Sequence, residues 1–76
     1  MEKILEILND IRLGIDWENE DDFIENGLLD SFDMITLVGE LNDVFNVSIG
    51  LEHLENENFN SVKAIAALLK ALGADI

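Results

Sequence analysis

Apolar residues recur at helical spacing in three separate stretches of this 76-residue chain, and this pattern limits the possible folds more than any other feature. The stretches cover residues 3–14, 30–45 and 60–73, and a short, weakly helical piece at 51–58 precedes the third. The sequence therefore predicts an all-α fold with one domain over 1–76. The expected architecture is a small four-helix bundle with a short third helix and a long loop between helices 1 and 2.

The second helix has the clearest start. Asp30 with Asp33 resembles a capping box, in which two side chains bond the free amides of the first turn, and acids there suit the helix dipole. The helix should begin at Asp30 or Ser31 and run to about Phe45. At about 100° per residue, six apolar side chains share an arc that should face the core: Met34, Leu37, Val38, Leu41, Val44 and Phe45.

The opposite side of this helix should face solvent. It carries Phe32, Asp33, Thr36, Gly39, Glu40 and Asp43. Phe32 is therefore an aromatic residue on a face expected to be exposed, one position past Ser31. Protein interfaces commonly centre on a few apolar anchors rimmed by charge, so this face is a candidate recognition surface.

The connection over residues 14–30 is long for so small a domain and lacks helical periodicity. Five apolar residues are predicted to hold this loop against the core: Trp17, Phe23, Ile24, Leu28 and Leu29. Because long ordered loops tend to carry function, the loop and the helix start that follows it form a candidate functional region.

The chain is strongly acidic, with 17 Asp and Glu against 4 Lys and Arg and a formal net charge of −13. This balance argues against nucleic-acid binding and polybasic attachment to membrane surfaces, because both need clustered positive charge. No apolar run approaches the roughly 18 residues of a membrane span. Acids interrupt the N-terminal apolar stretch, so no signal peptide is expected. These features predict a cytoplasmic protein.

Residues that could perform catalysis or bind a metal are few. The chain has no cysteine, which removes disulfides, thiolate zinc sites and cysteine nucleophiles. His53 is the single histidine, and nothing in the pattern brings it to a serine, so we interpret it as an ordinary surface residue. The acidic stretch at 16–27 fails as a calcium loop, because its sixth position is Asp21 and its twelfth is Gly27. We therefore expect neither an enzyme nor a metal site.

One short motif carries more information than the composition. Residues 27–34 read Gly-Leu-Leu-Asp-Ser-Phe-Asp-Met. This run resembles the phosphopantetheine attachment signature of acyl carrier proteins, in which a Gly is followed shortly by Asp-Ser and a large apolar residue. The likeness continues through 23–27, 37–49 and 57–65, and so covers nearly the whole chain. By this resemblance, Ser31 is the residue that receives 4′-phosphopantetheine.

The resemblance also implies partners. A separate phosphopantetheinyl transferase would move the arm from coenzyme A to Ser31, and loading and processing enzymes with basic surfaces would then exchange acyl or aminoacyl thioesters with it. Six residues are candidates for recognition by these partners: Asp30, Phe32, Asp33, Thr36, Glu40 and Asp43. The protein should act as a monomeric carrier domain with no catalysis of its own.

The motif leaves the cargo open, since fatty-acyl, polyketide, D-alanyl and other aminoacyl carriers all share it. Phe32 and Thr36 stand where fatty-acid carriers usually have Leu and often have Glu, and the stretch 45–62 is slightly longer than in the compact fatty-acid type. With the runs Gly-Leu-Leu-Asp-Ser-Phe and Glu-Asn-Phe-Asn-Ser-Val, this length resembles aminoacyl, D-alanyl or polyketide-type carriers. A different class of protein also fits the composition, namely a cofactor-free acidic module that binds basic partners. The intact mass after incubation with coenzyme A, magnesium and a transferase distinguishes the two classes.

Overall fold

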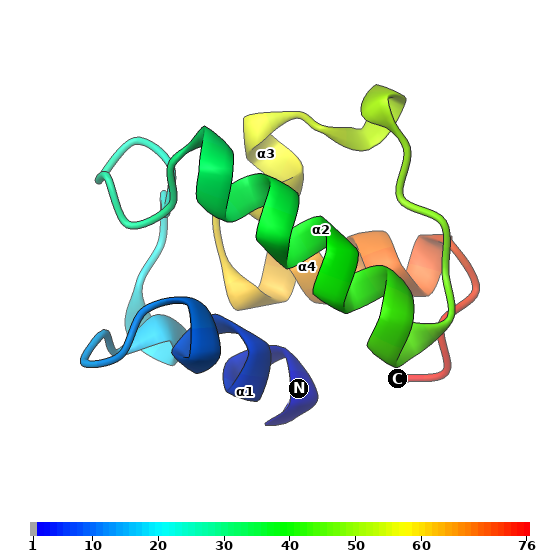
Figure 1. The fold of residues 1–76 in the computed structure, drawn as a ribbon, viewed down its shortest axis with the longest axis horizontal. Coiled ribbons are helices and arrows are strands. Elements are labelled where there is room, and N and C mark those ends of the chain that lie inside the picture. The colour runs from blue at the N-terminus through cyan, green and yellow to red at the C-terminus, as the bar shows by residue number, and fades with distance from the viewer. Residues whose placement is uncertain (1) are drawn as a thin grey trace.

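Four α-helices form a small bundle in the computed structural model, which describes residues 2–76 (Figure 1). They are α1 (Glu2–Ile11), α2 (Ser31–Phe45), α3 (Asn56–Phe59) and α4 (Val62–Ala71), with short 3-10 turns at Trp17–Asn19 and Leu51–His53. α1 packs against both α2 and α4, and α3 packs against α4. No strand occurs within the described range. The predicted all-α bundle with a short third helix and a long first loop is therefore confirmed.

α2 begins and ends where the sequence predicts. It starts at Ser31 behind an N-cap residue, Asp30, and its last residue is Phe45. Asn46 then adopts a left-handed conformation (φ 54°, ψ 50°), and its amide still bonds the Asn42 carbonyl. An Asn at such a position ends a helix because it tolerates positive φ better than most residues. None of the helices among residues 2–76 has the length and apolar character needed to cross a membrane.

The predicted ends of the first and last helices agree with the structure to different degrees. Ser61 caps α4, and its Oγ accepts a hydrogen bond from the Ala64 amide at 3.0 Å. α1 ends at Ile11, before the expected stop at Gly14, whose φ of +87° places it in the turn that follows the helix. Ile15 continues the apolar spacing of α1, yet it lies half-buried in the loop beyond it. The pattern therefore correctly predicts burial but extends the helix too far.

The core lies where α1, α2 and α4 meet, and three aromatic side chains from outside these helices complete it. Trp17, Phe23 and Phe59 are 1%, 0% and 0% exposed. The rings of Trp17 and Phe23 pack edge to face, with centroids 4.9 Å apart. Leu29 is also buried, and the two remaining predicted anchors of the first loop are half-buried against the core. The prediction that this loop is held by its apolar residues is confirmed.

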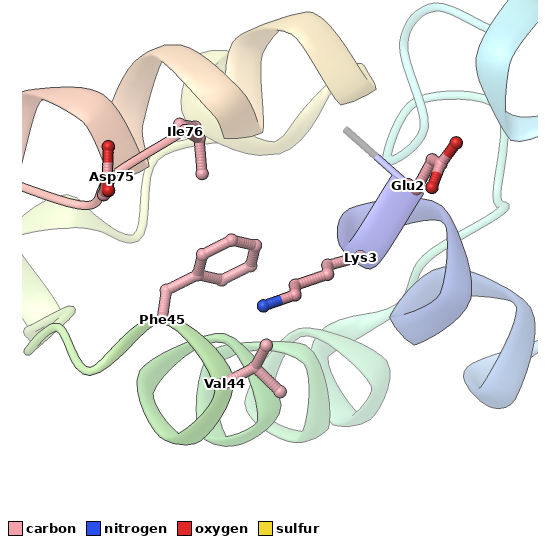
Figure 2. A pocket seen from close by; sticks show the side chains of 6 residues that line it. All are labelled: Glu2, Lys3, Val44, Phe45, Asp75 and Ile76. Carbon is pink, nitrogen blue, oxygen red and sulfur yellow. The ribbon is translucent and has the colours of Figure 1, made fainter.

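One residue assigned to the core side of α2 is exposed instead. Val44 has 41% of its surface exposed, although Leu37 and Leu41 on the same arc are fully buried. Val44 lies at the edge of that arc, about 60° around the helix from Leu41. It lines an open groove between the end of α2, the start of α1 and the C-terminal residues, together with Lys3 and Ile76 (Figure 2). The prediction for Val44 is therefore wrong.

The predicted third helix over 51–58 is split in two. The 3-10 turn at Leu51–His53 is followed by extended backbone at Glu55 (φ −109°, ψ 144°), and α3 begins only at Asn56. The Asn58 side chain donates a hydrogen bond to the His53 carbonyl at 2.9 Å. Asn side chains compete with the helix for backbone groups in this way, which accounts for the break.

Candidate functional site

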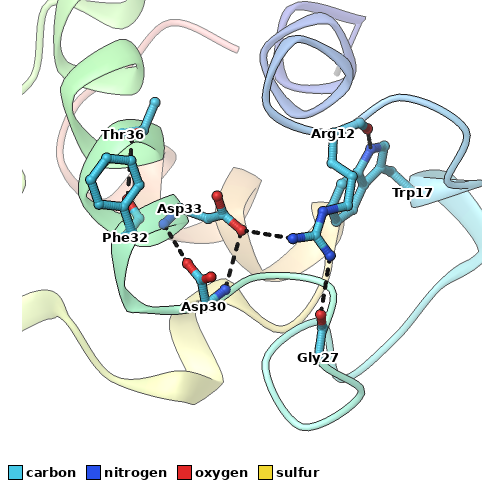
Figure 3. Close-up of polar contacts among 7 residues, drawn as sticks. All are labelled: Arg12, Trp17, Gly27, Asp30, Phe32, Asp33 and Thr36. Atoms are coloured by element: carbon cyan, nitrogen blue, oxygen red, sulfur yellow. Dashed lines mark hydrogen bonds and ion pairs between the residues drawn. The ribbon is translucent and has the colours of Figure 1, made fainter.

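Ser31 is the first residue of α2, and its side chain is exposed. The two acids on either side of it bond each other's backbone (Figure 3). Asp30 Oδ1 accepts a hydrogen bond from the Asp33 amide at 2.8 Å, and Asp33 Oδ2 accepts one from the Asp30 amide at 3.4 Å. The predicted capping box is therefore present, and it fixes the backbone on both sides of Ser31.

The first turn of α2 leaves two backbone amides available beside the Ser31 hydroxyl. The Met34 amide bonds the Asp30 carbonyl at 2.9 Å, and the Asp33 amide bonds the Asp30 side chain. The amides of Ser31 and Phe32 have no acceptor within residues 2–76. Free amides at the positive end of a helix dipole favour a phosphate group. The residues present therefore fit a phosphodiester on the Ser31 oxygen.

An open cavity of about 540 Å³ lies beside Ser31. Most of its walls are apolar side chains from the first loop, α2 and the segment before α3: Ile24, Leu29, Met34, Ile35 and Leu54. A larger open cavity, of about 690 Å³, lies at the other end of α2, next to Val44 and Phe45. The rise of an α-helix puts these residues about 20 Å from Ser31. The cavity at Ser31 is thus the one that a group attached there would meet.

The residues predicted for recognition separate into two groups in the structure. Phe32 is 77% exposed, and Thr36, Glu40 and Asp43 are exposed beyond it along the outward side of α2. The Thr36 hydroxyl donates to the Phe32 carbonyl at 3.3 Å. Asp33 instead turns away from this group, and only 17% of its side chain is exposed. Four of the six residues therefore share one face, while Asp30 and Asp33 are engaged in the capping box.

Two residues near Ser31 were not found from the sequence. Ile35 is 71% exposed and borders the cavity beside Ser31, one helical turn further along α2. Its spacing from Ser31 was a usable signal, because residues four apart lie on the same side of a helix. Arg12 donates from one guanidinium to the Gly27 carbonyl at 3.3 Å and to Asp33 Oδ2 at 3.4 Å (Figure 3). No spacing rule relates Arg12 to residues in another helix and loop.

His53, interpreted from the sequence as an ordinary surface residue, is half-buried and has a structural role. His53 Nδ1 accepts a hydrogen bond from the Gly50 amide at 3.3 Å, within the turn that leads to α3. Among residues 2–76, no group of three or more His, Asp or Glu side chains is placed to hold a metal ion. At the start of α2 the structure presents one exposed hydroxyl, that of Ser31.

Comparison with known proteins gives a consistent result over almost the whole chain. A family model described as the phosphopantetheine attachment site matches residues 2–69. A D-alanyl carrier protein from Leuconostoc mesenteroides is 36% identical over 73 residues, which cover 93% of this chain and 92% of the relative. D-alanyl carrier proteins from Leuconostoc citreum (33% over 73 residues, with the same coverage) and Lactococcus lactis subsp. cremoris (36% over 69 residues, 87% and 86%) are similar.

Proposed function

This chain belongs to the phosphopantetheine-binding carrier proteins, which hold 4′-phosphopantetheine covalently, and from that premise we propose that Ser31 is the attachment residue. The observation that carries the proposal is the exposed Ser31 hydroxyl at the start of α2, inside the motif Asp-Ser-Phe. The two free amides of the first turn support it, because they offer donors to a phosphodiester at that oxygen.

The part of this chain in the attachment reaction is small. The Ser31 oxygen bonds to the phosphorus that bears pantetheine in coenzyme A, its proton passes to a base of the transferase, and adenosine 3′,5′-bisphosphate leaves. Asp30 and Asp33 each accept a hydrogen bond from the other's backbone amide, and in this proposal they cap the helix while the transferase supplies the base. When bound, the group supplies a terminal thiol that carries cargo as a thioester, so the chain itself needs no cysteine.

For the cargo, we propose an aminoacyl group and, in particular, D-alanine. The support is the name shared by relatives from two genera, each aligned over more than four-fifths of this chain. Phe32 and Thr36, which depart from the usual residues of fatty-acid carriers, agree with this assignment. Fatty-acyl and polyketide cargoes are the alternatives that a loading experiment distinguishes.

The wider role follows from the same premise. We propose one monomeric carrier domain over 1–76 that has no catalysis of its own and works in the cytoplasm with a phosphopantetheinyl transferase and loading and processing enzymes. The core contains residues from both ends of the chain, including Ile4 and Ala74, which supports one domain. Residues 13–62 contain no Lys or Arg, so the negative charge of this segment is not offset by any basic side chain within it. A negatively charged surface attracts partner enzymes with basic surfaces.

Intact-mass measurement tests the attachment site. The purified chain is incubated with coenzyme A, magnesium and a broad-specificity transferase, and we expect its mass to rise by one phosphopantetheine group. Ser31→Ala should keep its helical circular dichroism, because Asp30 and not Ser31 caps α2, but should gain no mass. Ser48→Ala, which removes another exposed serine, is the matched control and should be modified normally. A wild-type chain that is never modified would favour the cofactor-free acidic module.

A second measurement tests the cargo. The modified chain is offered ATP with a ligase that activates D-alanine, and in parallel with an enzyme that activates fatty acids. We expect the mass of one alanyl group to appear in the first reaction and to be released by hydroxylamine, as a thioester requires. Loading by fatty acids alone would contradict the D-alanyl assignment and leave the attachment site intact.

A further inference from the structure

Arg12 is unlike the other basic residues of the chain. Within residues 2–76 it is the one Lys or Arg side chain that lies within ion-pair distance of a carboxylate, Asp33, at 3.4 Å. One terminal nitrogen of its guanidinium donates to Asp33 Oδ2 and the other donates to the Gly27 carbonyl (Figure 3). A planar guanidinium suits two acceptors at once, which a compact ammonium group does less well.

The two acceptors lie on either side of Ser31 in the sequence. Gly27 precedes it in the last part of the loop, and Asp33 follows it in the first turn of α2. The oxygen that accepts from Arg12 is the same Asp33 Oδ2 that accepts from the Asp30 amide. Arg12 is therefore joined both to the loop that leads to Ser31 and to the capping box around it.

The backbone of Arg12 is itself held by the core. Its amide bonds the Leu8 carbonyl at 3.0 Å, and its carbonyl accepts a hydrogen bond from Trp17 Nε1 at 3.3 Å. The fully buried Trp17 ring packs on Phe23, whose carbonyl in turn accepts the Leu28 and Leu29 amides at 2.8 and 3.2 Å. One buried pair of rings thus supports both the backbone of Arg12 and the loop just before Asp30.

We propose that Arg12 is a positioning residue for the modification of Ser31: its guanidinium holds residues 27–33 in the arrangement in which the transferase reaches the Ser31 hydroxyl. This proposal rests on the proposed attachment at Ser31. Arg12 is 43% exposed, and exposed ion pairs contribute little to stability, so its main effect falls on the local arrangement and less on the fold. Arg12 acts through Asp33 and Gly27 and does not touch the hydroxyl.

Charge alone predicts the opposite effect from positioning. The chain has a net charge of −13, so removal of one cation strengthens its attraction to a basic transferase. If Arg12 mattered only through its charge, Arg12→Ala would be modified as fast as the wild type or faster. If Arg12 positions the segment around Ser31, the same variant is modified more slowly.

The experiment compares Arg12→Ala and Arg12→Lys with Lys63→Ala, which removes one exposed positive charge from α4. Intact-mass time courses give kcat and KM of the transferase for each chain, and hydrogen exchange of the unmodified chains gives the protection of the four hydrogen-bonded amides around Ser31, those of Leu28, Leu29, Asp30 and Asp33. For Arg12→Ala we expect kcat/KM to fall by about tenfold and exchange of these four amides to accelerate. Arg12→Lys should be intermediate in both measurements, and Lys63→Ala should match the wild type.

The outcomes separate this inference from the proposed function. A wild-type chain that gains no mass contradicts the attachment at Ser31 itself. Normal modification of the wild type and an equal or faster rate for Arg12→Ala, with unchanged exchange, overturns the positioning role alone. If Arg12→Ala does not fold, Arg12→Lys tests the positioning role, because lysine keeps the positive charge but lacks the planar guanidinium that bonds two acceptors at once. Wild-type rate and wild-type exchange in Arg12→Lys overturn the proposal.

Discussion

The outward faces of α2 and α4 are both helix surfaces of the same small bundle, yet they expose different kinds of side chain. α2 leaves Phe32 and Ile35 in solvent, 77% and 71% exposed, with Glu40 and Asp43 further along the helix. The exposed positions of α4 hold only lysines and alanines: Lys63, Ala67, Lys70 and Ala71. The face of α4 shows that a helix of this bundle needs no large apolar side chain on its solvent-exposed side. The apolar residues on α2 therefore suit contact with a partner, and the fold does not require them.

The largest expected contrast is between two phenylalanines. Phe59 is fully buried, and Phe59→Ala should lower the free energy of unfolding by about 3–5 kcal/mol, enough to unfold much of so small a protein. Phe32 is 77% exposed, so Phe32→Ala should leave the melting curve nearly unchanged. The same change should lower kcat/KM for phosphopantetheine transfer by about tenfold, or roughly 1.4 kcal/mol of lost binding. Melting curves and transfer kinetics on the same preparations check both expectations.

Phe32→Ala also tests whether the α2 face differs in function from the α4 face. A large loss of stability with unchanged kinetics would mean that Phe32 packs inward on the first loop in solution. The α2 face would then be an ordinary solvated surface, as the α4 face is. Ile35→Ala tests the neighbouring residue in the same assay, and we expect a smaller loss there because Ile presents less apolar area than Phe.

Much of the fold could be predicted because the signals are local. Asp30 and Asp33 lie in one helical turn, and their reciprocal bonds fix the start of α2 at the predicted residue. Ser61 fixes the start of α4 with a single side-chain bond from the Ala64 amide. The exposure of Phe32 follows from its angle on α2, which depends on spacing within a single helix. Local capping chemistry and helical period therefore place the site.

The features that could not be predicted depend on contacts between segments. Val44 fits the apolar arc of α2, but whether it is buried depends on which element covers the end of that helix. The break before α3 comes from the Asn58 side chain reaching the His53 carbonyl. Arg12 meets Gly27 and Asp33 only after three segments have packed. Hydrophobic periodicity describes one helix at a time, so it gives no information on contacts between side chains of different segments.

Charge provides a second, smaller test of the two faces. Glu40→Gln combined with Asp43→Asn should lower kcat/KM for transfer by about two- to fivefold at low ionic strength, because charges at the edge of an interface act mainly on the association rate. Lys63→Gln combined with Lys70→Gln alters α4 and should leave the rate unchanged or slightly higher. The difference should shrink as salt screens the charges. Equal effects of the two pairs would show that partners respond to net charge and not to the α2 face.

Gly39 provides the smallest and most local test, because it lies in the middle of α2 on the exposed side. Its φ is not in the left-handed region, and a Cβ atom built there meets nothing within 4 Å. Gly39→Ala should therefore stabilise the protein by about 0.5–1 kcal/mol, since a helical Gly costs about that much relative to Ala. Ala67→Gly on the exposed side of α4 should destabilise it by a similar amount.

The kinetic consequences of these two substitutions should differ, although both change one methyl group on an exposed helix. At about 100° per residue, Gly39 lies between Ile35 and Phe32 around α2, so a partner that covers those residues comes close to it. The added methyl should then lower kcat/KM for transfer by about threefold, less than the tenfold expected of Phe32→Ala. Ala67→Gly should not change the rate while the protein stays folded. If Gly39→Ala stabilises the chain and leaves transfer untouched, the partner does not reach this turn, and the recognition surface is confined to the first turns of α2.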